Sequence, residues 1–188
     1  MTAALTALET RQNAIAPADD ALFEYVHGEQ VEKPMGIMST VLAFVLARHL
    51  DEFARTRNLG IAVAEAMFLF ELEPRHSRRP DVAFVSRENI FQHPIPARGD
   101  WETVPELAVE VVSPNDDITA VDQKVVEYFQ FGVKQVWVLF PETKRLYVHE
   151  SLDHVSVVNE GQIIRGGLLL PEFALPLADL FAAVPVAE

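Results

Sequence analysis

Two hydrophobic periods alternate along this chain. Residues 106–113 carry apolar side chains at every second position and lead into a Ser-Pro-Asn-Asp turn, a pattern that predicts a β-strand. Residues 40–57 and 119–131 repeat their apolar side chains at helical spacing instead, so each predicts a helix with one buried face. Because glycine accepts the backbone conformation that ends a helix, we expect Gly60 and Gly132 to end these helices.

Hydroxyl side chains stand at the start of both predicted helices, where Ser39 and Thr119 are the expected N-caps. Further strands are predicted around them: a hairpin turning at Gly28, runs at 61–71 and 81–86, and a pair around the turn at 141–144. Residues 73–79 and 87–105 read as connections. This order predicts an α/β protein in which a mixed β-sheet is flanked by helices.

Composition adds that the chain is globular. It has 188 residues, of which 49% are hydrophobic and 23% charged, enough to bury a core and too apolar for disorder. We predict a flexible N-terminal arm at residues 1–20 and a single domain at residues 21–188. No apolar run reaches the ~20 residues of a membrane span, so no membrane partner is expected. The absence of cysteine excludes disulfides and fits a cytoplasmic protein.

Charge restricts the partners further. A net charge of −13 argues against broad adhesion to nucleic acid, so an anionic substrate must meet metal ions or a local basic patch. One candidate patch precedes Asp81 and contains Arg75, Arg78 and Arg79. If Asp81 lies in a cleft, these guanidinium groups would suit phosphate oxygens. The alternative is a solvated hairpin tip.

Glu110 is the anomaly in the pattern, because it lies inside the apolar strand at 106–113. A lone buried carboxylate loses hydration worth several kcal/mol unless a cation, a basic partner or a raised pKa compensates. Asp81 begins the preceding predicted strand, and Lys124 lies at the margin of the buried face of the helix at 119–131. Two carboxylates and a lysine suit metal-assisted phosphodiester hydrolysis. Alternatively, Glu110 and Lys124 form a buried ion pair.

These residues also match a known pattern. The segments Arg79-Pro80-Asp81, 110–114, 122–124 and 132–137 resemble, in order and spacing, the PD-(D/E)XK nuclease superfamily. More closely they are similar to its Uma-type branch of putative restriction endonucleases, and the resemblance extends over 24–181. It implies a restriction-endonuclease-like core and a DNA endonuclease that uses Mg²⁺, for which Mn²⁺ can substitute.

The resemblance also implies roles for individual residues. Asp81 and Glu110 would be the metal-binding acids, and the main-chain carbonyl of Val111 would be a third ligand. Lys124 would be the catalytic lysine, moved onto the helix because Val112 stands where the superfamily has lysine. Some members of the superfamily use a further glutamate near the first helix, for which Glu29 and Glu32 are the candidates.

Two further questions stay open at the level of sequence. Cutting both strands of DNA would favour a homodimer, and the apolar tail at 168–181 either forms that interface or seals the core. The missing lysine at position 112 and the overall acidity support an alternative function. The chain would then be a non-catalytic nucleic-acid-binding or regulatory protein on the same fold.

Overall fold

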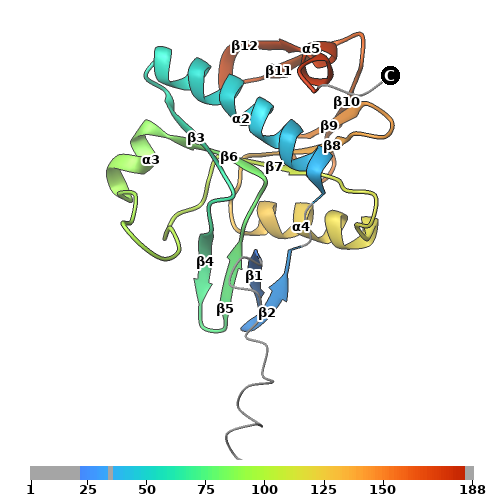
Figure 1. Cartoon of the computed structure of the whole chain (residues 1–188). Coiled ribbons are helices and arrows are strands. Elements are labelled where there is room, and N and C mark those ends of the chain that lie inside the picture. Colours follow the sequence, from blue (N-terminus) through green and yellow to red (C-terminus); the bar gives the residue numbers. More distant parts are fainter. Residues whose placement is uncertain (1–21, 34–35, 185–188) are drawn as a thin grey trace, which may run out of the picture.

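The computed structural model describes residues 22–33 and 36–184. The arm predicted at residues 1–20 therefore lies outside the described residues. Figure 1 shows the arrangement of the elements. In chain order they are β1 (Phe23–Val26), β2 (Glu29–Glu32), α2 (Ile37–Thr56), β3 (Gly60–Ala64), β4 (Phe68–Leu72), β5 (Arg75–Arg78), β6 (Val82–Ser86), α3 (Arg87–Gln92), β7 (Leu107–Val111), α4 (Ile118–Gln130), β8 (Gln135–Phe140), β9 (Arg145–His149), β10 (Val155–Asn159), β11 (Ile163–Gly166), β12 (Leu170–Pro176) and α5 (Leu177–Ala182).

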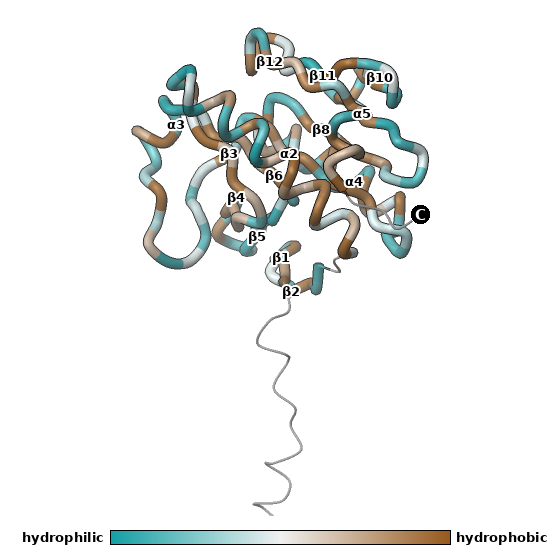
Figure 2. The backbone as a smooth tube through the Cα atoms, turned by 45° about the horizontal axis from the view of Figure 1, so that its top comes forward, coloured by the Kyte–Doolittle hydropathy of each residue, from teal (hydrophilic) through white to brown (hydrophobic). Residues whose placement is uncertain are grey.

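A six-stranded sheet forms the centre of the fold, with the order β10-β9-β8-β7-β6-β3. Strands β7 and β8 run parallel, whereas the other neighbouring pairs are antiparallel. Helix α2 covers one face of this sheet and α4 the other (Figure 1). Hydrophobic residues concentrate along the central strands, while the outer turns are hydrophilic (Figure 2). The predicted α/β fold with a mixed sheet between helices is confirmed.

Strand β7 divides its side chains between the two faces of the sheet, as its period of two requires. Leu107, Val109 and Val111 join the core under α2. Ala108 joins the core under α4, together with Tyr128 of that helix. Glu110 alternates with Val109 and Val111, so its carboxylate points toward α4.

A second, four-stranded sheet with the order β2-β1-β5-β4 lies on the α4 side of the central sheet (Figure 1). Two of its strands differ from the sequence prediction. The run at 61–71 is split into β3 and β4, because Glu65 takes a positive φ of 53° between them. Residues 75–78, predicted as part of a connection, form β5. Their Arg-His-Ser-Arg sequence has no apolar period, and the strand is buried through ion pairs instead.

The helix ends also differ from their prediction. Helix α2 begins at Ile37, about one turn before the expected start, and Gly36 is its N-cap. Ser39 therefore lies inside the helix, where its hydroxyl donates a hydrogen bond to the Gly36 carbonyl over 2.8 Å. At the other end Asn58, with a φ of 58°, takes the left-handed conformation that we expected at Gly60.

Helix α4 is capped by Asp117 rather than by Thr119. The Asp117 carboxylate accepts a hydrogen bond from the Thr119 backbone N–H over 2.8 Å. Aspartate is among the strongest N-caps, since its charge also favours the positive end of the helix dipole. Gly132 follows the helix with a φ of 97°, as predicted.

The predicted connection at 87–105 contains the short helix α3, and Trp101 anchors the rest. Its ring stacks on Phe68 with the ring centres 5.6 Å apart, and its indole N–H donates to the His93 carbonyl. The apolar tail forms β12 and α5, whose buried side chains join the core under α2. The tail therefore seals the core. In the described ranges, no helix combines the length and apolarity needed to cross a bilayer.

Gly60 offers a test of this packing. A Cβ atom at this position would lie 2.1 Å from the Val85 carbonyl oxygen, in the strand paired with β3, and the residue has a φ of 155°. We expect Gly60→Ala to lower the free energy of unfolding by about 3 kcal/mol, since backbone atoms must move. Urea unfolding measures the change. Gly161→Ala is the control, because a Cβ there meets no atom within 4 Å. Equal stability of the two variants would contradict this packing.

Candidate active site

Asp81 and Glu110 meet at one end of the central sheet. Val82 pairs with Val109 in the antiparallel register of β6 and β7, so one further step places Asp81 beside Glu110. Asp81 is 8% exposed. Its Oδ2 accepts a hydrogen bond from the Val111 backbone N–H over 2.5 Å, which fixes the carboxylate against β7.

Glu110 is 6% exposed and is bound by two side chains of α4. Its Oε1 accepts a hydrogen bond from the Tyr128 hydroxyl over 2.5 Å, and its Oε2 lies 3.2 Å from the Lys124 Nζ. Burial raises the pKa of Glu110 above its ordinary value, and the neighbouring Asp81 adds to this effect against the opposing charge of Lys124. The structure thus brings together the three residues that the sequence singled out.

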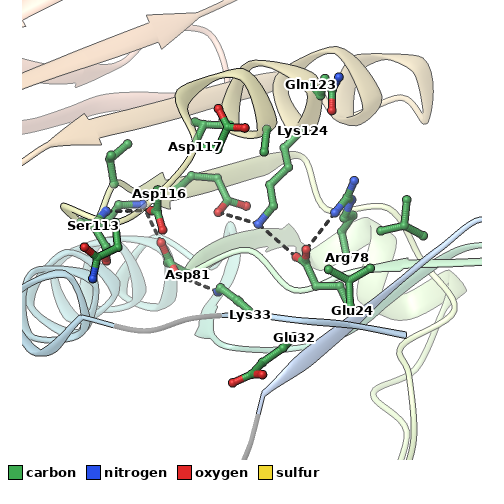
Figure 3. A pocket seen from close by; sticks show the side chains of 18 of the residues that line it. Glu24, Glu32, Lys33, Arg78, Asp81, Ser113, Asp116, Asp117, Gln123 and Lys124 are labelled. Atoms are coloured by element: carbon green, nitrogen blue, oxygen red, sulfur yellow. Dashed lines mark hydrogen bonds and ion pairs between the residues drawn. The ribbon is translucent and has the colours of Figure 1, made fainter. Parts of the chain in front are cut away.

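Glu24 is a third buried acid, which the sequence analysis missed. Its Oε1 lies 3.3 Å from the Lys124 Nζ and accepts from the Arg79 backbone N–H. Its Oε2 accepts a hydrogen bond from Arg78 over 2.8 Å (Figure 3). Burial alone would raise the pKa of Glu24, but the charges of Lys124 and Arg78 outweigh it and hold this pKa below its ordinary value.

The glutamates proposed as additional acids are placed differently. Glu29 and Glu32 both lie on the exposed strand β2, at the wall of the cavity. In the described ranges neither forms an ion pair, and Figure 3 shows Glu32 apart from the network around Lys124. A signal for Glu24 was present, since it stands in a short strand between Phe23 and Tyr25, as Glu110 stands between valines.

Lys33 is the second residue that the sequence analysis missed. It follows β2, is 8% exposed, and its Nζ lies 2.6 Å from the Asp81 Oδ1 (Figure 3). The same ammonium donates to the Glu65 carboxylate and to the Arg79 carbonyl oxygen. Burial opposes the charge of Lys33, but the carboxylates of Asp81, Glu110 and Glu65 outweigh it and raise the pKa of this lysine.

The three arginines before Asp81, for which the sequence predicts phosphate binding, are held by other groups of the protein. Arg78 is buried between Glu24 and Glu127, and both ends of its guanidinium are occupied. Arg75 pairs with Asp100 over 2.7 Å. Arg79 donates to the Glu65 carbonyl oxygen over 2.6 Å. Arg78 is thus directed inward from β5, because buried carboxylates require positive partners.

A cavity of about 630 Å³ opens between β1, β2, α4 and the end of β7. Its wall contains the two central carboxylates and both lysines: Asp81, Glu110, Lys33 and Lys124. Within the described part of the chain, no cluster of three or more His, Asp or Glu side chains is arranged to hold a metal ion. The oxygen donors that the cavity wall does offer are the carboxylates of Asp81 and Glu110 and nearby main-chain oxygens. Such a set fits Mg²⁺ and Mn²⁺, which take one or two carboxylates and complete their coordination with water and phosphate oxygens.

Comparisons with known proteins agree with this fold. The model of the family described as "Uma2: Putative restriction endonuclease" matches residues 11–178. Among solved structures, the chain is similar to the crystal structure of a putative nuclease belonging to DUF820 from Anabaena variabilis ATCC 29413. The TM-score is 0.74 at 19% sequence identity, and the match covers 89% of this chain and 94% of that chain. A likeness at this identity shows the shared fold. No curated protein matches the chain.

The buried network predicts a pH-dependent contribution from Glu24. Glu24→Gln removes the carboxylate that Arg78 and Lys124 share, so we expect the free energy of unfolding to fall by about 3–5 kcal/mol near neutral pH. Because the folded-state pKa is lowered, this contribution is present above the ordinary value of 4.5 and is lost as the pH falls through the lowered pKa. Urea unfolding of the wild type and variant over a pH series measures the difference.

Glu32→Gln is the matched control, because it makes the same change on the exposed neighbouring strand. We expect it to change stability by less than about 0.5 kcal/mol. A loss as large as that of Glu24→Gln, or a difference that does not shrink in acid, would contradict the assignment of Glu24 to the network.

Proposed function

We propose that this chain, which belongs to the Uma2 family of putative restriction endonucleases, hydrolyses phosphodiester bonds of DNA with a bound divalent cation. One observation carries the proposal. Asp81 and Glu110 are buried side by side on neighbouring strands, next to Lys124, in the wall of an open cavity. Buried ionisable groups with shifted pKa values that line a cavity are typical of functional sites, which favours this function.

The roles proposed for the two acids follow from their carboxylate oxygens, which can bind a metal ion. Asp81 and Glu110, with the main-chain carbonyl of Val111, would hold Mg²⁺, and Mn²⁺ would substitute for it. When bound, the cation neutralises phosphate charge and lowers the pKa of a coordinated water. Tyr128 orients Glu110, since its hydroxyl fixes one carboxylate oxygen and leaves the other toward Lys124.

Lys124 acts as a cation in this proposal and not as a base. Burial opposes its charge, but Glu110 and Glu24 outweigh burial and raise the pKa of Lys124. An ammonium that stays protonated can donate to a phosphate oxygen and stabilise negative charge as it develops. Glu24 would then be a positioning residue, because it holds the ammonium 3.3 Å away.

A non-catalytic role remains the second candidate, and one observation favours it. Both oxygens of Glu110 and both of Asp81 already accept hydrogen bonds from protein groups. A network satisfied in this way can be purely structural. The chain would then bind nucleic acid or regulate a partner on the same fold without cleavage.

Cleavage of both DNA strands requires two sites, so we propose a homodimer. The buried side chains of the apolar tail pack in the core under α2, so they are not available for a dimer interface. Exposed apolar side chains at the start of α2 are better candidates, namely Ile37, Met38 and Phe44. A cytoplasmic location remains the expectation from the cysteine-free composition.

Metal binding and cleavage test the function together. We expect Mn²⁺ to bind the wild type in calorimetric titration, and Asp81→Asn and Glu110→Gln to abolish this binding because each removes a charged ligand. Nicking of supercoiled plasmid DNA in Mg²⁺ should fall by about a hundredfold or more in both variants. An RNA substrate assayed in parallel shows whether the protein cleaves DNA, RNA or both.

Asp153→Asn is the matched control, since it makes the same change at an exposed position outside the cavity. Magnesium-type sites can need the substrate phosphate to complete their coordination, so each titration is repeated with DNA present. A folded wild type that neither binds metal nor cleaves DNA under these conditions would favour the non-catalytic alternative.

A further inference from the structure

Lys33 already binds the oxygens that a divalent cation would use. Its Nζ lies 2.6 Å from the Asp81 Oδ1, 3.0 and 3.2 Å from the two Glu65 oxygens, and 2.8 Å from the Arg79 carbonyl oxygen. All of these partners are hard oxygen donors, and together they satisfy the three N–H groups of the ammonium. Magnesium and manganese prefer the same carboxylate and carbonyl oxygens.

The two oxygens of Asp81 differ in how they are held. Oδ2 is bound by a backbone N–H of β7, which belongs to the rigid centre of the sheet. Oδ1 is bound by an ammonium on a flexible four-carbon stem. In the described ranges, Lys33 is also the one basic side chain that pairs with Asp81. An incoming cation can therefore reach Oδ1 by moving one side chain.

We propose that Lys33 is the resident cation of this site, which neutralises Asp81 until a divalent cation displaces its ammonium. The inference rests on the metal-dependent function proposed above. It assigns to Lys33 a role distinct from that of Lys124, which is paired with Glu110 and Glu24 and not with Asp81.

Displacement of the Lys33 ammonium would couple the binding of the metal ion to the binding of the substrate. The released ammonium needs a new anion, and the cavity of about 630 Å³ next to it is where a DNA phosphate would enter. Phosphate would thus both complete the metal coordination and receive Lys33. Metal alone should bind weakly, and metal in the presence of DNA should bind tightly, because the cost of displacing Lys33 is then offset.

A different role for Lys33 predicts the opposite sign. If its ammonium only holds Asp81 in the geometry needed for metal, then removing Lys33 should weaken metal binding. If Lys33 competes with the metal, then removing it should strengthen the binding. The sign of the change in affinity therefore separates the two roles.

Calorimetric titration of Mn²⁺ into the full-length Lys33→Met variant makes this test. Methionine has a similar length, no charge and a flexible stem suited to a buried site. We expect Kd to be about tenfold lower than in the wild type, because the competing charge is gone. We also expect DNA to tighten metal binding more in the wild type than in the variant, because phosphate completes the coordination in both proteins but receives a displaced ammonium only in the wild type.

Lys144→Met is the matched control. It removes the same charge from this acidic protein, but at a surface lysine that pairs with Glu160, so Kd should stay within about twofold. Thermal melting gives a second readout. Without metal, Lys33→Met should melt below the wild type, since Asp81 and Glu65 lose their cation, and Mn²⁺ should raise its melting temperature more than that of the wild type.

Each outcome decides the inference. Unchanged or weaker Mn²⁺ binding by Lys33→Met overturns it, while the proposed function survives if Asp81→Asn still abolishes the binding seen in the wild type. Binding by the variant alone supports it. Absence of binding by both folded proteins, with and without DNA, overturns the inference and the proposed metal site together. If Lys33→Met does not fold, Lys33→Gln replaces it with the same expected signs.

Discussion

The buried ion pairs of Glu24 are the interaction on which the rest of the site depends. Lys124 of α4 and Arg78 of β5 bind the same carboxylate of β1. Arg78 also forms an ion pair with Glu127 on α4. A charge removed from water costs several kcal/mol unless opposite charges surround it. The four-stranded sheet is therefore joined to α4 through charge as well as apolar packing. This joint brings the β1–β2 hairpin, and with it Lys33, over the end of β7.

Most of the fold could be predicted because its central elements follow a hydrophobic period. Strand β7, the helices α2 and α4, and the pair β8 and β9 each carry an apolar pattern that matches their final burial. Strand β5 could not be predicted in this way, because its residues are polar and become buried only by pairing with acids elsewhere in the chain. The role predicted for Gly60 was wrong for a local reason, because Asn58 takes the left-handed conformation that follows α2.

The site was predictable to the extent that its residues break a local pattern. Glu110 interrupts an apolar strand and Lys124 stands at the margin of a buried helix face, so both could be found from the sequence. Glu24 had the same kind of signal in a strand too short to be noticed. Lys33 had none, because it follows an exposed strand and its burial depends on Asp81, which lies 48 positions away in the chain.

The position of Lys124 bears on the proposed catalysis, because Val112 stands where the resemblance implies a lysine. A lysine in such a site acts through the location of its ammonium, and Lys124 brings that group from α4 to within 3.2 Å of Glu110. Val112 meanwhile packs into the apolar core under α4, which fixes the helix that carries the lysine. Because the helix lies next to β1, Lys124 also pairs with Glu24. The Glu24 carboxylate helps to keep the buried Lys124 ammonium charged. Asp81, Glu110, Lys124 and Glu24 therefore form one electrostatic unit, in which Glu24 on β1 supplies the second negative partner of a buried lysine on α4.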